Sequence, residues 1–252
     1  MRYVRARNQT LYTKLAFDPA KDFAPIALFA TAPIVLMVNP AVPANNVQEL
    51  IALAKKEPGK INFASAGNGT TNHLSGELFK SRANIDIVHV PYRGAAPAIN
   101  DLLGQQVQMA FLDLPVILPH IKSGMLRPIA LGAPKRAPTS PEVPTTAEVG
   151  MPDLLIENWY GMIAPAGTPA NIVNLLNRVT NEAMGDPKVA QKLADQGLTV
   201  AGDTPEHFRD YIARDQKMGE GDQGRRHRDG EVKMARVCFS NPAVRATLRT
   251  ES

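Results

Sequence analysis

The chain has 252 residues, with ordinary apolar and charged fractions of 44% and 21%, so it can bury one large hydrophobic core or two modest ones. Its one cysteine, Cys238, excludes an internal disulfide and a cysteine-based metal site. The net charge of +4 comes from the two ends, because residues 15–218 hold two more acidic than basic side chains; neither end interleaves aromatic residues with basic ones, so nucleic acid is not an expected partner.

The first predicted element is extended and runs from Ala24 to Val38, with two apolar runs separated by Thr31-Ala32-Pro33. We interpret it as one long strand with a bend. The sequence Asn46-Val47-Gln48-Glu49 is a capping box, and apolar residues follow at helical spacing until Pro58-Gly59 ends the helix. The most apolar run, Ile34–Val38, is too short to span a bilayer.

Strands and helices then alternate. The expected elements are a strand at 61–66, a helix with an apolar face of Leu74, Leu78 and Phe79, a strand at 85–90, a turn at 91–97 leading into a helix that ends near 104, a strand at 107–112, a helix at 115–122 and a strand at 126–131. This rhythm predicts an α/β fold with mostly parallel sheets covered by helices on both faces.

The third part of the chain begins with a connection, residues 132–150, that is rich in proline, alanine and threonine, and we place a lobe boundary there. Residues 154–164 are predicted to be extended; Trp159 among them is expected to pack in a core or a lobe interface rather than line a cleft. Amphipathic helices are predicted after Pro169, Pro187 and Pro205, the last two with proline at the first helical position.

The glycine-rich stretch Ile61–Leu74 carries the most specific chemistry. Gly67 and Gly69 permit a tight strand-to-helix turn, and the polar residues around them surround the unpaired amides of a helix start, a typical anion receptor. Neither a lysine after Gly69 nor a third glycine with a downstream acid is present, so a carboxylate is favoured over a nucleotide. The alternative is that the glycines only form a compact turn and the polar residues only cap a helix.

Other kinds of site find less support. The five histidines, His73, His89, His120, His207 and His227, lack metal-ligand spacing, so no metal and no cofactor are expected. We expect His73 to pack beside the turn rather than contact a ligand. The Gly-x-Ser-x-Gly pattern of a nucleophile elbow is missing around Ser65, which lies between Ala64 and Ala66, so no catalytic residue is assigned. An α/β hydrolase acting at Ser65 is kept as an alternative.

Several motifs occur in a fixed order along residues 8–218: Phe63-Ala64-Ser65-Ala66-Gly67-Asn68-Gly69-Thr70, His89-Val90-Pro91-Tyr92-Arg93-Gly94-Ala95-Ala96-Pro97-Ala98, Asp101-Leu102-Leu103-Gly104, Leu118-Pro119-His120-Ile121-Lys122-Ser123-Gly124, Pro144-Thr145 and Ala164-Pro165-Ala166-Gly167-Thr168-Pro169. In this order they resemble the extracytoplasmic solute receptors of tripartite tricarboxylate transporters, the Bug family.

The resemblance implies a periplasmic-binding-protein-like (type II) α/β fold with two lobes that close on a small carboxylate and deliver it to membrane permease subunits. Residues 1–32 and 133–218 are then a remnant of the first lobe and residues 33–132 are the second lobe. The implied protein is a monomeric receptor, not an enzyme. The ligand-binding residues it implies are Ser65, Ala66, Gly67, Asn68, Gly69, Thr70, Thr71, Tyr92, Arg93, Gly94 and Asp113, although Arg93 is equally well explained as a solvated turn residue.

The sequence also departs from the family pattern. Family members carry a signal peptide and most of a first lobe before the segment that starts here near Asn8. We therefore expect an incomplete first lobe and weak or no ligand binding. The family is periplasmic, but without a recognisable signal peptide we expect a cytoplasmic location for the chain as given. Residues 219–252 do not resemble the closing helix of the family and are expected to be disordered, as a frameshifted or engineered tail would be. A non-functional pseudogene product is a further alternative, and the sequence does not identify the carboxylate.

Overall fold

A computed structural model of the chain describes residue 18 and residues 21–214. The strands are β1 (Phe23–Val38), β2 (Asn62–Ser65), β3 (Val88–Pro91), β4 (Met109–Asp113), β5 (Arg127–Leu131), β6 (Glu157–Pro165) and β7 (Thr199–Val200). The helices are α2 (Val47–Lys56), α3 (Thr71–Ala83), α4 (Ala95–Leu103), α5 (Leu114–Lys122), the short 3₁₀ helix η1 (Pro152–Leu154), α6 (Ala170–Gly185) and α7 (Pro187–Asp195), and residues 205–214 are also helical. The predicted tail, 219–252, lies outside the described residues.

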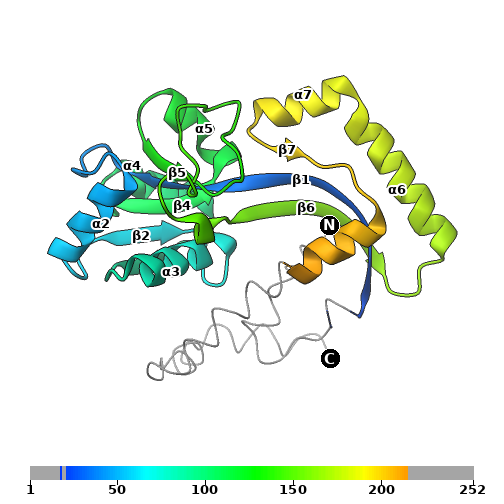
Figure 1. The fold of residues 1–252 in the computed structure, drawn as a ribbon, viewed down its shortest axis with the longest axis horizontal. Coiled ribbons are helices and arrows are strands. Elements are labelled where there is room, and N and C mark those ends of the chain that lie inside the picture. Colours follow the sequence, from blue (N-terminus) through cyan, green and yellow to red (C-terminus); the bar gives the residue numbers. More distant parts are fainter. Residues whose placement is uncertain (1–17, 19–20, 215–252) are drawn as a thin grey trace, which may run out of the picture.

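The long strand β1 connects the two halves of the molecule (Figure 1). From Phe23 to Pro33 it pairs with β6, with β7 also joining this part, and from Ile34 to Val38 it lies between β4 and β5. The single long strand predicted from the two apolar runs is therefore confirmed. We call the elements around β2–β5 the larger half and those around β6 and β7 the smaller half.

Both faces of the sheet in the larger half are buried. Side chains of β1 alternate between them, so that Leu36 packs with Phe63 and Phe111 on one side, while Met37 packs with Leu102 and Leu112 on the other. Helices α2 and α3 contribute to the first of these cores, and α4 and α5 to the second. The continuous apolar run in β1 is the pattern of a strand that is covered on both faces.

The predicted α/β fold is confirmed, but the sheet is mixed rather than mostly parallel. Strand β2 runs parallel to β3 and β4, whereas β1 is antiparallel to β4, β5, β6 and β7. The strand–helix alternation that motivated the expectation describes the crossover connections from β2 through β3 and β4 to β5, which all run in one direction, but not β1, which lies antiparallel between β4 and β5. Because β1 extends through both halves, it has one direction in both, and this direction is opposite to that of β4, β5, β6 and β7.

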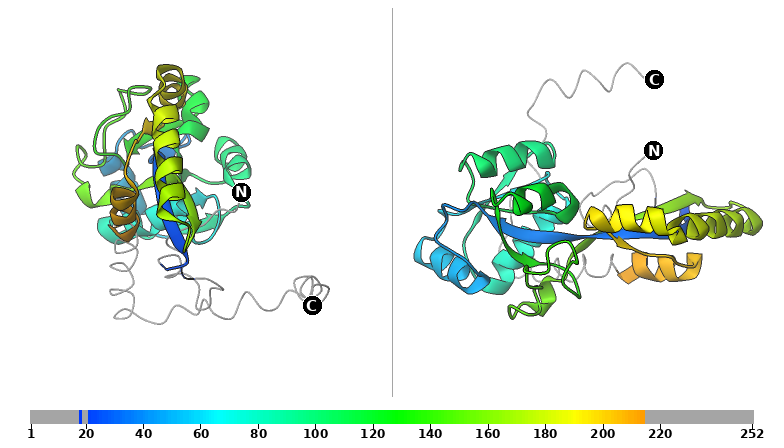
Figure 2. Two further views of the ribbon diagram at one scale, coloured as in Figure 1. Left: turned by 90° about the vertical axis from the view of Figure 1, so that its right-hand side faces the viewer. Right: turned by 90° about the horizontal axis from the view of Figure 1, so that it is seen from above.

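The smaller half has little core of its own. Its buried apolar cluster consists of Ile26, Ala27 and Ala164, with partly buried neighbours around them. Helix α6 has no buried residue, and its apolar side chains Ile172, Leu175 and Val179 are 39%, 45% and 51% exposed. Figure 2 shows this helix along the outer end of the molecule. None of the helices in the described part of the chain is both long and apolar enough to cross a bilayer.

Local signals account for several element boundaries. The side chain of Asn46 accepts a hydrogen bond from the Glu49 N–H (2.9 Å), as the capping box predicts, while the Glu49 carboxylate accepts from the Asn46 side-chain amide (2.7 Å) and from the Asn45 N–H (2.7 Å). Thr145 and Glu148 form both bonds of a capping box, because the Glu148 carboxylate accepts from the Thr145 N–H (2.7 Å) and the Thr145 hydroxyl accepts from the Glu148 N–H (3.2 Å), but only a turn follows. The strand expected at 85–90 is shorter, β3, because Gly59 and Lys80 bond the backbone of Asp86 and Ile87 from outside the sheet.

Candidate functional site

Three strand ends and three helix starts meet at one edge of the larger half. The parallel strands β2, β3 and β4 end at Ser65, Pro91 and Asp113, and each is followed by a helix, α3, α4 and α5. In open α/β sheets this carboxyl edge is where ligands bind, because the partly positive helix N-termini converge there. The candidate residues of the sequence analysis, which lie up to 48 positions apart, all belong to this edge.

Internal hydrogen bonds define the shape of the Ser65–Thr71 turn. The Gly67 N–H donates to the Ser65 hydroxyl (3.2 Å), and the Gly67 carbonyl accepts from the Thr70 hydroxyl (2.8 Å) and the Thr70 N–H (3.2 Å). Gly67 and Gly69 have φ values of +129° and +71°, which side chains rarely permit. Thr70 is the N-cap of α3, with its hydroxyl accepting from the His73 N–H at 3.2 Å.

The turn leaves some backbone donors available. Within the part of the chain that the structure describes, the N–H groups of Asn68, Thr71 and Asn72 donate to no protein acceptor. The Asn68 residue is exposed and Thr71 is half-buried. These are the donors that an anion at the start of α3 would use.

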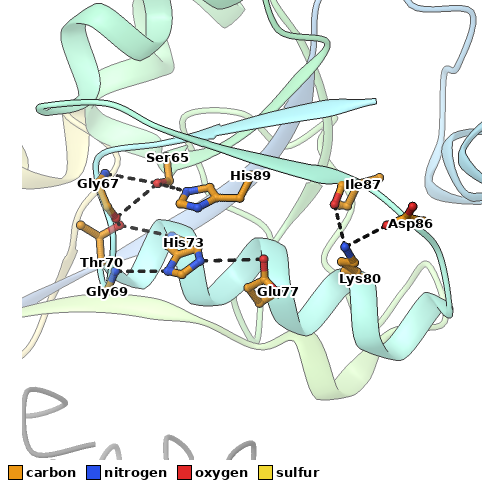
Figure 3. Close-up of polar contacts among 10 residues, drawn as sticks. All are labelled: Ser65, Gly67, Gly69, Thr70, His73, Glu77, Lys80, Asp86, Ile87 and His89. Atoms are coloured by element: carbon orange, nitrogen blue, oxygen red, sulfur yellow. Dashed lines mark hydrogen bonds and ion pairs between the residues drawn. The ribbon is translucent and has the colours of Figure 1, made fainter. Parts of the chain in front are cut away.

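Two stacked imidazoles support the turn from one side (Figure 3). His89, on β3, places Nε2 2.7 Å from the Ser65 hydroxyl, and His73, on α3, accepts a hydrogen bond from the Gly69 N–H at Nδ1 (3.2 Å). The ring centroids of the two histidines are 4.0 Å apart at an interplanar angle of 18°, and Phe63 stacks on the other face of His89 at 4.8 Å. Ser65 is fully buried beneath this stack.

The environment of His89 disfavours its charged form. Burial, together with a smaller effect of the neighbouring His73 in the same direction, lowers the pKa of this imidazole from 6.5 to about 4. The ring is therefore neutral near pH 7. A neutral ring adds no positive charge to the site, so attraction for an anion has to come from the backbone amides.

Asp113 joins the two halves of the molecule. Its carboxylate accepts a hydrogen bond from the Asn72 side-chain amide at 3.0 Å and two from that of Asn158, on β6, at 2.8 and 2.9 Å. Asn158 pairs with Ala32 of β1 close to the point where β1 changes partners. The structure thus places the predicted Asp113 beside the α3 N-terminus and at the junction between the halves.

The second predicted turn, Tyr92–Gly94, lies beside the first. The Tyr92 N–H donates to the Ser65 carbonyl (3.1 Å), and the Tyr92 hydroxyl donates to Asp101 (2.7 Å); burial, reinforced by Asp101, raises the pKa of this phenol to about 12. Gly94, with φ +127°, begins α4 without a side-chain cap. Arg93 is exposed, so no described residue holds its guanidinium over the turn.

The sequence analysis missed parts of this site. His73 does pack beside the turn, as expected, but the contact of His89 with Ser65 was not predicted, nor was the bond from Asn158 to Asp113. The expected apolar face of α3 was also wrong in part. Phe79 is buried, but Leu74 and Leu78 are only partly so, and the buried face is otherwise Asn72, His73, Ser75 and Gly76. Small and polar residues there let the helix approach the sheet and the turn closely.

The Ser65–His89 pair bears on the hydrolase alternative, since a serine next to an imidazole is the first requirement of such an enzyme. Ser65, however, has no exposed surface on which to meet a substrate, and its hydroxyl already contacts Gly67 and His89. In the described residues no group of three or more histidine, cysteine or acidic side chains is arranged to hold a metal ion.

Comparison with known proteins gives a consistent result. Residues 2–220 match the model of the tripartite tricarboxylate transporter family receptor (TctC). A UPF0065 protein from Pseudomonas sp. strain P51 is 38% identical over 206 residues, covering 81% of this chain and 61% of the relative, and protein BugT from Bordetella pertussis is 37% identical over 204 residues, covering 81% and 63%. The chain thus spans about three-fifths of the length of these relatives.

Solved structures agree with the sequence relatives. A structure described as a periplasmic transporter has a TM-score of 0.80 at 39% identity, covering 88% of this chain and 73% of its own. An R. palustris protein solved with adipate has a TM-score of 0.78 at 33% identity, covering 83% and 70%. MatC from Rhodopseudomonas palustris, solved with bound malate, has a TM-score of 0.76 at 29% identity, covering 84% and 73%. The predicted type II periplasmic-binding-protein fold is confirmed by this likeness.

Proposed function

The chain belongs to the tripartite tricarboxylate transporter receptor family, and we propose that it is a solute receptor that binds a small carboxylate at the Ser65–Thr71 turn. Two of its structural relatives were solved with adipate and with malate, which are both dicarboxylates. We therefore infer a dicarboxylate of four to six carbons as the class of ligand.

The observation that carries this proposal is the set of backbone donors at the start of α3. The N–H groups of Asn68, Thr71 and Asn72 have no acceptor among the described residues, and the α3 dipole adds a partial positive charge at the same place. A carboxylate bound there would satisfy these donors with charge-assisted hydrogen bonds. Because recognition of this kind uses the backbone, few side chains of the site indicate which ligand is bound.

We propose that the chain is not an enzyme. The buried position of Ser65 supports this view, as do relatives that are receptors. The test is direct: wild type and Ser65→Ala are incubated with a chromogenic ester. We expect no turnover from either protein, and turnover lost specifically in Ser65→Ala would establish the hydrolase instead.

We further propose that the receptor acts as a monomer in the periplasm and passes its ligand to the permease subunits of a tripartite transporter. Two relatives of known structure are described as a periplasmic transporter and as the periplasmic binding protein BugD, which supports the location. Co-purification with the membrane subunits of a tripartite transporter tests the partner. A receptor of this family that never associates with them in the presence of ligand would have another role.

We expect weak affinity from the chain in its present form. Family receptors close two lobes on the ligand, and in the smaller half three apolar residues of α6 are exposed and the buried cluster is small. A ligand held by the larger half alone would lose the contacts and the exclusion of water that closure supplies. Micromolar binding of malate, adipate, citrate or glutamate in isothermal titration calorimetry would contradict this expectation.

The site itself is tested with one pair of variants at Thr71, the first residue of α3. Thr71→Pro removes the backbone N–H together with the threonine side chain, and it is compatible with the helix because proline is favoured at this position and the preceding Thr70 is extended, with φ −74° and ψ 159°. Thr71→Ala keeps the N–H and removes the side chain. We expect Thr71→Pro to weaken malate binding about tenfold or more, the effect of one charge-assisted hydrogen bond, and Thr71→Ala to change it little.

The measurement is an NMR titration with malate, read from the amide signals of Asn68 and Asn72, because it detects weak binding. The neutral diamide of malate serves as the ligand control. Malate-dependent shifts confined to other parts of the larger half, or equal affinity of the two Thr71 variants, would remove the turn from the proposal.

A further inference from the structure

The two imidazoles beside the turn contact its opposite ends. His89 reaches the beginning, at the Ser65 hydroxyl, and His73 reaches the end, at the Gly69 N–H (Figure 3). Between these two contacts lie Gly67 and the exposed Asn68, and directly after them comes the start of α3. The stacked rings are therefore placed to set the conformation of the part of the turn that presents the free amides.

We propose that His73 is a positioning residue for this turn, and that its protonation releases Gly69 and weakens ligand binding. The part that concerns ligand affinity rests on the proposed function. His73 holds Gly69 without contacting the anion itself, since its side chain is only 9% exposed and lies on the inner face of α3.

The geometry fixes which form of His73 can do this. A nitrogen that accepts the Gly69 N–H carries no proton, so the neutral ring must have its proton on Nε2, which lies 3.8 Å from the Glu77 carboxylate. A second proton has to bind at Nδ1. There it would face the Gly69 N–H, donor against donor, and the bond that holds the end of the turn would be lost.

The charged groups around His73 come from several elements. Glu77, on the same helix, favours the charged ring, whereas His89, on β3, is stacked at 4.0 Å and would oppose it if charged. From β4, Asp113 bonds the neighbouring Asn72, and from η1, Asp153 pairs with Arg82 (3.4 Å) in the last turn of α3. Strand β2 contributes no titratable side chain.

His89 does not compete as the sensor. Its burial lowers the pKa to about 4, so His89 stays neutral over the range in which an ordinary histidine titrates. Its contact with Ser65 therefore persists while the contact of His73 with Gly69 is lost. Acidification would loosen only the end of the turn that lies next to α3.

The experiment compares wild type with His73→Asn. The shorter side chain of asparagine can place its oxygen near the position of Nδ1, where it accepts the Gly69 N–H and does not titrate. The first measurement needs no ligand: the NMR shift of the Gly69 amide is followed from pH 8 to pH 5. We expect a one-proton curve in wild type, with the same midpoint as the His73 ring signals, and a flat line in His73→Asn.

The second measurement is the malate affinity of both proteins at pH 7.5 and pH 5. The protonation of malate itself is common to the two proteins, so the ratio of their affinities isolates the histidine. We expect the malate affinity of the wild type to fall by about fivefold relative to that of His73→Asn at the lower pH, which is the effect of one neutral hydrogen bond.

Two results would overturn the inference: a Gly69 shift that does not follow the His73 ring in wild type, or an equal pH dependence of Gly69 in both proteins. The first is read from wild type alone, so it stands even where the variant does not fold. If Gly69 titrates as expected but malate binds neither protein at pH 7.5, then the proposed function fails and the proton-dependent hold of His73 on Gly69 is confirmed.

Discussion

The contact between α3 and β2 gives the most direct test of the packing beneath the site. A methyl group added at Gly76 would lie 2.1 Å from Cε2 of Phe63 and 2.6 Å from two further ring atoms. Phe63 is fully buried, stacked against His89 and packed edge-on against Phe111, so its ring has no free space to move into. We therefore expect Gly76→Ala to force α3 away from the sheet.

The magnitude follows from two opposing effects. Overpacking of a buried contact costs about 1–3 kcal/mol, and a contact this short belongs at the upper end. Replacing glycine by alanine in a helix stabilises the helix by up to about 1 kcal/mol. The net loss in the free energy of unfolding is about 2 kcal/mol, which lowers the midpoint of thermal unfolding by about 4–8 °C for a chain of this size.

The control is Gly185→Ala at the end of α6, where an added methyl group meets nothing within 4 Å. Circular dichroism melts of wild type and both variants are compared at pH 7.5. We expect Gly185→Ala to melt at or slightly above the wild-type temperature. A Gly76→Ala midpoint equal to that of wild type would mean that the helix does not lie against Phe63 as described.

The same melts test three further predictions. Asp113→Asn should lower the free energy of unfolding by about 1–3 kcal/mol, since one carboxylate oxygen becomes a donor that faces the amides of Asn72 and Asn158. The control, Asp153→Asn, breaks an exposed ion pair with Arg82 and should lower the free energy of unfolding by less than about 1 kcal/mol. Equal losses in the two variants would count against the role of Asp113. Asn46→Ala removes the α2 cap and should cost about 1 kcal/mol, a cost that an unchanged midpoint would disprove. His89 has a pKa of about 4 in the folded protein and 6.5 in the unfolded chain, so the unfolded state takes up the proton first as the pH is lowered. The contribution of His89 to the free energy of unfolding should therefore be fully present above pH 6.5 and should fall as the pH is lowered towards 4. In His89→Gln the decrease should be less steep.

Local patterns in the sequence predicted much of the fold. The two apolar runs of β1 and the capping box at Asn46 and Glu49 depend only on neighbouring residues, and both features are present in the structure. Strand direction was less predictable. The chain from β2 to β5 alternates strands and helices, but residues of β1 pair with antiparallel partners up to 170 positions away, and no local sequence pattern predicts that pairing.

The candidate site divides in the same way. The turn at Gly67 and Gly69 was predictable because positive φ values favour glycine, and its hydroxyl-rich flanks are typical of helix starts. The role of His89 was not predictable, because only the parallel register of β2 and β3, which pairs Phe63 with His89, places the ring next to Ser65. Whether each candidate residue contacts a ligand remains a prediction.

The sequence by itself determined the order of the elements, the helix caps and the backbone shape of the turn, since each of these arises from interactions within a few residues. Only the tertiary structure decided that three strand ends share one edge, that Asp113 meets Asn158 of the other half, and that His73 stacks on His89. Such contacts join residues 16 to 48 positions apart, and they exist only after sheet pairing and packing have offset the conformational entropy of bringing those segments together.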